Sequence, residues 1–179
     1  MKISKKQVLF ALILASTSAF AETKSESSFF VDVGYTGLTY KEDANSFSPS
    51  AVRVTVGKNE GNNFGYEGLL AIGAGSDTKL VSGTSVKLSI PTIYGLYAKG
   101  YINPSDNIEL FGRFGFAGIS TKVVGNSTAT SSGSGLSYGV GVKFVITKDV
   151  KLTADYMTYY PTKNAVSLSG YTLGASFGF

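Results

Sequence analysis

The chain has 179 residues, neither cysteine nor histidine, and a formal net charge of +4. The lack of cysteine excludes disulfide bonds and thiolate metal sites, and the length supports one domain. Lys2, Lys5 and Lys6 are three of the 16 lysines and arginines, so the chain after them carries a net charge of only +1. The composition therefore gives no support for a nucleic-acid partner.

The first 21 residues have the three parts of a secretory signal. A basic start is followed by an apolar run from Val8 to Leu14 and by small residues that include Ala19 and Ala21. The apolar run is shorter than the about 20 residues that a membrane-spanning helix needs. We therefore expect an exported protein, cleavage after Ala21, and a single domain over residues 22–179.

Eight segments of the remaining chain alternate apolar and polar residues, and none shows a sustained helical period. They are residues 29–36, 52–56, 64–72, 88–99, 108–116, 136–146, 150–160 and 171–179. Such segments predict half-buried strands, and an even number of them can close into an all-β, antiparallel up-and-down barrel. Between the strands we predict short connections at residues 58–62, 103–106, 147–149 and 161–165, and longer polar loops at residues 41–48, 76–85 and 120–134.

The charged residues of these segments fall on one face when each register is set from the apolar residues alone. They are Asp32, Arg53, Glu67, Lys87, Lys99, Glu109, Arg113, Lys143, Lys151 and Asp155. A lysine or arginine at mid-depth in a bilayer costs about 2–4 kcal/mol, so contact with lipid would enforce this separation. A soluble barrel that binds an apolar ligand inside would alternate in the same way, so a second criterion is needed.

Three features favour a transmembrane barrel over a soluble one. Glycines gather on the charged face, aromatic residues gather near strand ends, and the chain ends at Phe179 after apolar residues at every second position. We expect Phe179 to form the C-terminal signal for barrel assembly. We also expect a structural network of ion pairs that fills the lumen and consists of Asp32, Arg53, Glu67, Lys99, Glu109, Arg113, Lys143, Lys151 and Asp155.

One strand contains an irregular position. Pro91 lies inside the segment 88–99, where a proline removes a donor from the hydrogen-bond ladder, so we predict a local bulge near Ile90. The register assigned to this segment places Leu88 and Ile90 on the lipid-facing side and Ser89 on the charged side.

These residues resemble the outer-membrane β-barrel family that includes the eight-stranded OmpA-like and OmpX-like barrels. The stretches that carry the resemblance are YGLYAKGYIN at 94–103, ELFGRFGFAG at 109–118 and YGVGVKFVITKDVKLTADY at 138–156. The resemblance covers residues 22–179 and implies a monomer in the bacterial outer membrane, in contact with its lipid and inserted by the barrel-assembly machinery. Two-domain relatives continue into a peptidoglycan-binding domain, and we expect no such domain after Phe179.

The sequence favours a non-enzymatic protein without cofactor or metal. The barrel enzymes of this class rely on histidine, which is absent, and the strand serines lack a nucleophile motif. The Ser-, Thr- and Gly-rich segment 124–135 is predicted to be a mobile external loop. The leading expectation is a scaffold with a polar, plugged lumen whose external loops meet a ligand or a host surface. The alternatives are a narrow porin-like channel for small solutes or ions and a periplasmic barrel that binds an apolar ligand.

Overall fold

The computed structural model describes residues 28–43, 45–60, 63–81, 83–163 and 166–179, so the predicted signal segment lies outside the described residues. The described residues form nine strands and no helix long and apolar enough to cross a membrane. The strands are β1 (Ser28–Glu42), β2 (Asn45–Phe47), β3 (Ser50–Glu60), β4 (Phe64–Val81), β5 (Thr84–Ser105), β6 (Ile108–Val124), β7 (Thr128–Val145), β8 (Val150–Lys163) and β9 (Val166–Gly178).

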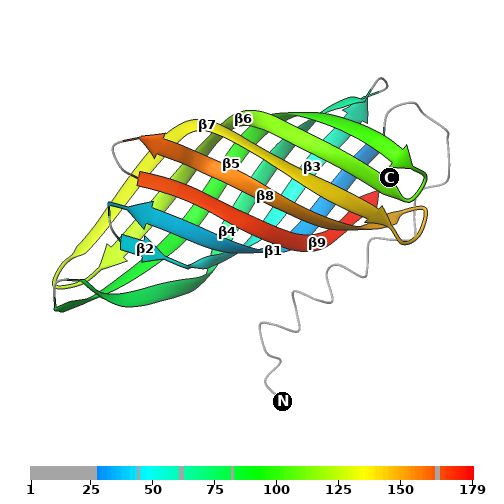
Figure 1. The fold of residues 1–179 in the computed structure, drawn as a ribbon. Coiled ribbons are helices and arrows are strands. Elements are labelled where there is room, and N and C mark those ends of the chain that lie inside the picture. Colours follow the sequence, from blue (N-terminus) through cyan, green and yellow to red (C-terminus); the bar gives the residue numbers. More distant parts are fainter. Residues whose placement is uncertain (1–27, 44, 61–62, 82, 164–165) are drawn as a thin grey trace, which may run out of the picture.

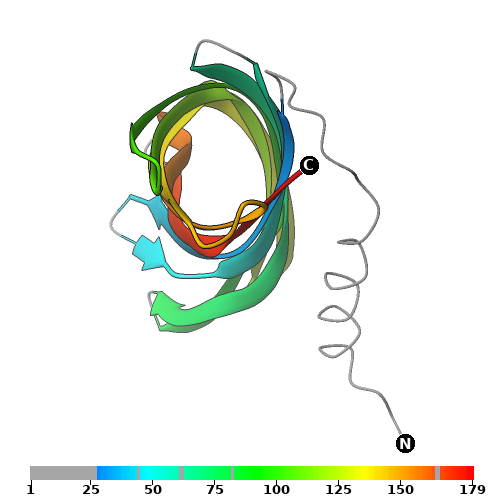
Figure 2. The same cartoon turned by 90° about the vertical axis from the view of Figure 1, so that its right-hand side faces the viewer.

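Eight of these strands close into an antiparallel ring. Each of them pairs with the next long strand along the chain, and β9 returns to pair with β1 from Phe30↔Gly178 to Glu42↔Val166. The tilted strands are visible in Figure 1 and the closed ring in Figure 2. The short strand β2 pairs with the same edge of β1 as β3 does, beyond the end of the β1–β3 ladder. The prediction of an eight-stranded up-and-down barrel is confirmed.

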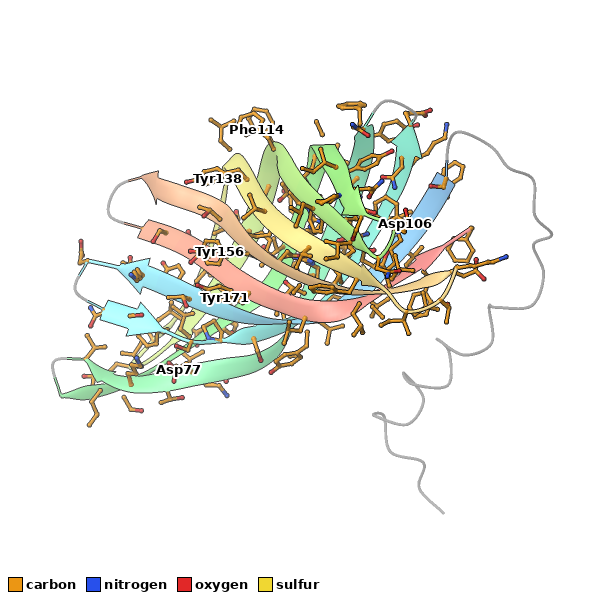
Figure 3. The ribbon with its side chains drawn as sticks, turned by 45° about the vertical axis from the view of Figure 1, so that its right-hand side comes forward. Asp77, Asp106, Phe114, Tyr138, Tyr156 and Tyr171 are labelled. Carbon is orange, nitrogen blue, oxygen red and sulfur yellow. The ribbon has the colours of Figure 1, made fainter. Side chains whose placement is uncertain are left out.

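The two ends of the barrel differ. The β3–β4, β5–β6 and β7–β8 connections lie at one end together with Phe179, and we call this the turn end. The other end, the hairpin end, carries β2 and the tips of the β4–β5 and β6–β7 hairpins. Asp106 and Asp77, labelled in Figure 3, mark the turn end and the hairpin end respectively.

Two of the predicted long loops are wrong because their residues are mainly strand. β4 and β5 stay paired up to Val81↔Thr84, and β6 and β7 up to Val124↔Thr128. Most of the predicted mobile loop 124–135 therefore belongs to β7. Serine, threonine and glycine do not prevent a strand here, because β6 offers a complete ladder of partners over this length.

The predicted bulge at Pro91 is confirmed. The registers of β5 with β4 and with β6 both shift beside it, between Ile72 and Ser76 and between Ser89 and Thr92. Between these two pairs with β6, β5 contains one residue more than its partner. The inward and outward faces of β5 are therefore exchanged on the side of the hairpin end.

The predicted orientation is consequently wrong before Pro91. Leu88 and Ile90 are 1% and 0% exposed inside the barrel, whereas Lys87 is exposed on the outer face. An apolar residue there marks the interior, while Tyr94 and Leu96 beyond the bulge point outward as predicted.

Some neighbouring strands approach too closely for any side chain. A Cβ atom on Gly115 would lie 1.9 Å from the Leu96 carbonyl oxygen, and one on Gly174 would lie 2.2 Å from the Val33 carbonyl oxygen. These contacts are with backbone atoms, so only glycine fits at these two positions of the wall.

Candidate functional site: the lumen and the protruding hairpins

The outer wall of the barrel is apolar around its circumference. Large apolar side chains that are exposed on it include Tyr35, Val54, Val56, Leu70, Ile72, Tyr94, Leu96, Leu110, Phe114, Phe116, Leu136, Tyr138, Val140, Leu152, Tyr171 and Leu173. Phe114, Tyr138, Tyr156 and Tyr171 follow one another across β6 to β9 in Figure 3. A soluble monomer rarely exposes a continuous apolar surface of this extent, whereas a lipid-facing wall requires it.

The half of the lumen nearer the turn end contains the charged side chains, which we call the ionic tier. It comprises Asp32, Arg53, Glu67, Lys99, Glu109, Arg113, Lys143, Lys151 and Asp155. Arg53 and Asp155 form a bidentate ion pair, in which Nη1 donates to Oδ1 at 2.8 Å and Nη2 contacts Oδ2. Arg53 Nη1 also donates to the Tyr159 hydroxyl at 3.2 Å. The bidentate geometry holds the guanidinium plane in one orientation.

Glu109 lies between two lysines. Lys99 Nζ donates to Oε1 at 2.7 Å and Lys151 Nζ donates to Oε2 at 2.8 Å. A third lysine, Lys143, donates at 2.9 Å to Asp32 Oδ1. The Glu109 cluster joins β5, β6 and β8, and the Lys143–Asp32 pair joins β7 to β1, so charge-assisted hydrogen bonds connect distant parts of the ring.

Arg113 and Glu67 form a fully buried contact within the ionic tier. Their side chains are both 0% exposed, with Nε 2.9 Å from Oε2, and Arg113 Nη1 lies 3.7 Å from Asp155 Oδ2. None of the described residues makes a hydrogen bond of good geometry with either carboxylate oxygen of Glu67. The Phe111 ring lies 4.7 Å below the guanidinium carbon, so a cation–π contact contributes to holding the arginine in place.

Aromatic rings contact the ammonium groups of the ionic tier. Lys143 Nζ lies 4.1 Å from the centroid of Phe30, and Lys99 Nζ lies 4.6 Å from the same ring. One inward-facing ring thus contacts two cations, which are attracted to its electron-rich faces. The two-residue alternation places Phe30 inward once Phe29 faces outward, but the sequence alone does not show which cations the Phe30 ring contacts.

The half of the lumen nearer the hairpin end is apolar, which differs from the predicted polar interior. This apolar tier consists of Leu38, Tyr40, Phe47, Ala51, Leu69, Ala71, Leu88, Ile90, Ile93, Tyr97, Ala117, Ile119, Met157, Tyr159 and Leu168. The change occurs within single strands. On β8, Asp155 belongs to the ionic tier and Met157 to the apolar tier, two positions further along the same inward face.

The two tiers together fill the lumen with side chains. An eight-stranded barrel is just wide enough to be filled in this way, and the largest buried side chains, Arg53 and Tyr159, come from opposite tiers. Among the described residues, no group of three or more His, Cys, Asp or Glu could hold a metal ion. The lumen is a packed core in which each charged group of the ionic tier lies beside a group of opposite charge.

The hairpins of β4–β5 and β6–β7 extend beyond the ring as a protruding sheet of four paired strand segments. At its β4 edge, the Ser48 amide donates to Asp77 Oδ2 at 2.9 Å and Lys79 Nζ donates to the Ser46 carbonyl, so β2 and the residue after it cover the edge. At the other edge, the ladder of β7 with β8 stops at Tyr138↔Thr158. Residues 128–137 pair only with β6 within the described part of the chain.

The comparisons with known proteins place this geometry in a family. The family model described as "Outer membrane protein beta-barrel domain" matches residues 8–179. No curated sequence matches the chain.

Several solved structures share the fold. Ail, the attachment invasion locus protein of Yersinia pestis, aligns with a TM-score of 0.66 and 20% identity, over 87% of this chain and 100% of Ail. Neisserial surface protein A aligns with a TM-score of 0.66 and 19% identity, over 88% and 100% of the two chains. The N-terminal barrel of Pseudomonas aeruginosa OprF aligns with a TM-score of 0.55 and 14% identity, over 87% and 98%.

The prediction that the protein lies in the bacterial outer membrane is confirmed together with the fold. In such barrels the short turns face the periplasm and the longer hairpins face the outside of the cell. The family model covers most of the chain, and the structure has an apolar outer wall around a lumen that contains paired charges. The chain therefore belongs to the outer-membrane β-barrel protein family.

Proposed function

We propose that this protein is a non-enzymatic surface-interaction protein, in which the closed barrel is a scaffold and the protruding sheet meets a ligand outside the cell. The observation that carries this proposal is the filled lumen. Ion pairs occupy its periplasmic half and packed apolar side chains its external half. An apolar barrier in series with fully paired charges disfavours the passage of ions and polar solutes.

The protruding sheet supports the external half of the proposal. The open edge of β7, with the sequence TATSSGSGLS at 128–137, carries neither charge nor proline, the two devices that usually protect an exposed edge. Its unpaired backbone groups are able to hydrogen-bond an added strand. Among the proteins of similar fold, Ail has been crystallised in complex with the heparin analogue sucrose octasulfate.

The proposal is tested by conductance and by binding. Purified protein in planar bilayers should show no steady ohmic current, and cells that display it should bind an extracellular matrix preparation better than cells that display a variant without the β6–β7 protrusion. A reproducible open channel in the wild-type protein would favour the alternative, a narrow channel for small solutes or ions.

Export and assembly are further parts of the proposal. We expect cleavage after Ala21, insertion of a monomer by the barrel-assembly machinery, and recognition of the final strand through Phe179, whose amide donates to the Phe29 carbonyl at 2.9 Å and so joins the two ends of the barrel sequence. Phe179→Ser should lower the amount of protein inserted in cells while leaving refolding of the purified chain into detergent unchanged. A parallel loss in both assays would show a structural role instead.

A further inference from the structure

The outer wall of β3, β4 and β5 contains an open groove of about 510 Å³, a volume within the range of ligand pockets. Cross-strand pairing places Val56, Gly68 and Leu96 in one outward-facing row. A Cβ atom on Gly68 would meet only Leu96 Cδ2 at 3.8 Å and the Val56 carbonyl oxygen at 4.0 Å. The missing side chain therefore leaves a notch in a wall that is otherwise covered by large apolar residues.

The groove extends toward the periplasmic end along the next row of the wall. That row contains Lys58, Tyr66 and Ala98, in which the small alanine continues the notch. Val56 and Leu96 form its sides, and all five residues line the groove. Its walls suit a hydrocarbon chain that lies along the barrel.

Charged groups stand at the periplasmic mouth of the groove. Lys58 Nζ lies 2.6 Å from Glu60 Oε1 and 5.6 Å from the centroid of the Phe29 ring, and the Tyr66 hydroxyl donates to Glu60 Oε1 at 3.1 Å. The Lys58 and Glu60 side chains remain 23% and 39% exposed. Lys58 follows Val56 on the outward face, so a cation, an anion and a hydroxyl are presented beside lipid at the level of the headgroups.

We propose that this groove binds one glycerophospholipid of the periplasmic leaflet, with preference for an ethanolamine headgroup. One acyl chain lies in the notch at Gly68, Lys58 pairs with the phosphate, and Glu60 accepts hydrogen bonds from the ammonium group. A choline headgroup has no N–H donor for Glu60, and a glycerol headgroup has no cation to balance it. The pair at the mouth thus matches the zwitterion in both sign and hydrogen bonding. The site does not depend on the proposed surface function.

The test is native mass spectrometry of the purified full chain released from detergent that contains equal amounts of phosphatidylethanolamine, phosphatidylglycerol and phosphatidylcholine with identical acyl chains. The expected result is one retained lipid, with ethanolamine favoured about tenfold, which corresponds to about 1.4 kcal/mol. Equal retention of the three lipids would mean an ordinary annular lipid and would overturn the proposal.

Variants distinguish acyl-chain binding in the groove from headgroup selection at its mouth. Gly68→Leu should remove the retained lipid of every class, and Glu60→Gln should keep a lipid but abolish the preference for ethanolamine over choline. The matched control is Ala154→Leu, which fills a second depression of about 230 Å³ on β7 to β9 whose outward-facing lining is uncharged. It should leave retention unchanged.

A further control keeps the charge change on the same side of the membrane. Lys58→Gln should weaken retention of all three lipids, because each carries the phosphate with which Lys58 pairs, whereas Lys148→Gln, in the β7–β8 connection, should have no effect. Folding of each variant is checked by its faster migration in unboiled gel samples. Should Gly68→Leu fail to fold, the two mouth variants decide the question, and an unchanged lipid profile in both would overturn the proposal.

Discussion

Asp155 connects two arginines inside the barrel, and its removal gives the sharpest test of the ionic tier. The Asp155 side chain is 0% exposed and that of Arg53 2%, and the two share a bidentate contact. Arg113 Nη1 lies 3.7 Å from the same carboxylate and keeps Glu67 as a second partner. In Asp155→Ala, Arg53 would retain only the Tyr159 hydroxyl among these contacts.

The expected loss of stability follows from this geometry. A pair of unit charges about 4 Å apart attracts by about 4 kcal/mol at an effective dielectric constant near 20. Breaking a buried pair by removing one partner costs about 3–5 kcal/mol, because the remaining charge stays out of water. The folding equilibrium constant should therefore fall by about 10²- to 10⁴-fold. The double variant Arg53→Met/Asp155→Ala removes both charges and should recover most of this loss.

Urea titration of the protein in lipid vesicles measures these differences. The chain has no tryptophan, so circular dichroism and the folded band of unboiled gel samples replace tryptophan fluorescence. Lys79→Ala is the control, because its partner Asp77 lies 3.8 Å away on the exposed protruding sheet and such pairs contribute about 0–1 kcal/mol. A loss below about 1 kcal/mol for Asp155→Ala, or a double variant no more stable than the single one, would refute the reasoning.

Three further predictions test the register, the wall and the hairpins. Ile90→Asp should prevent folding or lower the free energy of unfolding by several kcal/mol, because the side chain is 0% exposed. Ser89→Asp on the outer face should be tolerated, and urea titration compares the two variants. Gly115→Ala should destabilise the β5–β6 ladder, while Gly100→Ala, with nothing within 4 Å of its Cβ, should not; equal midpoints would contradict the close-approach argument. Replacing residues 122–130 with Asn-Gly should leave a folded, heat-modifiable barrel, because a two-residue turn can connect the paired residues Thr121 and Ser131. An unfolded band before boiling would show instead that the protruding sheet stabilises the ring.

The alternation of residues predicted the ring because lipid imposes one rule on every strand. Outside the membrane, apolar side chains no longer have to face outward. The orientation predicted from the sequence becomes wrong there. Alternation predicts that Leu88 and Ile90 face lipid, because apolar residues mark the lipid face elsewhere, yet they lie in the apolar tier. Pro91 predicted the bulge, but the reversal of faces depends on which ladder gains the extra residue, and this is decided by the partners β4 and β6.

Pairing in the lumen could be predicted only as a composition of charges. The alternation assigns Arg53 and Asp155 to the inward face, but they are 102 residues apart, and only closure of β9 onto β1 brings their strands across the ring from each other. The segment 128–135 looks like a loop for the opposite reason. Its glycines and alanine have low strand propensity, and pairing with the long strand β6 overrides that preference.

The shifts in strand pairing limit the length of uninterrupted wall that the barrel can place in a membrane. Nine consecutive pairs run without interruption from Phe64↔Gly100 to Ile72↔Thr92, and eleven run from Thr92↔Ser120 to Ile102↔Leu110, with irregular rungs only beyond them. A tilted strand of about 9–11 residues is what a bilayer core requires. The regular part of the wall therefore fixes the thickness of the hydrocarbon core that the barrel can span. In a bilayer with a thicker core, the register shifts beside Pro91 and their unpaired backbone groups would enter the hydrocarbon. The barrel is therefore matched to a core that about 9–11 strand residues span, and it should resist transfer to a thicker one.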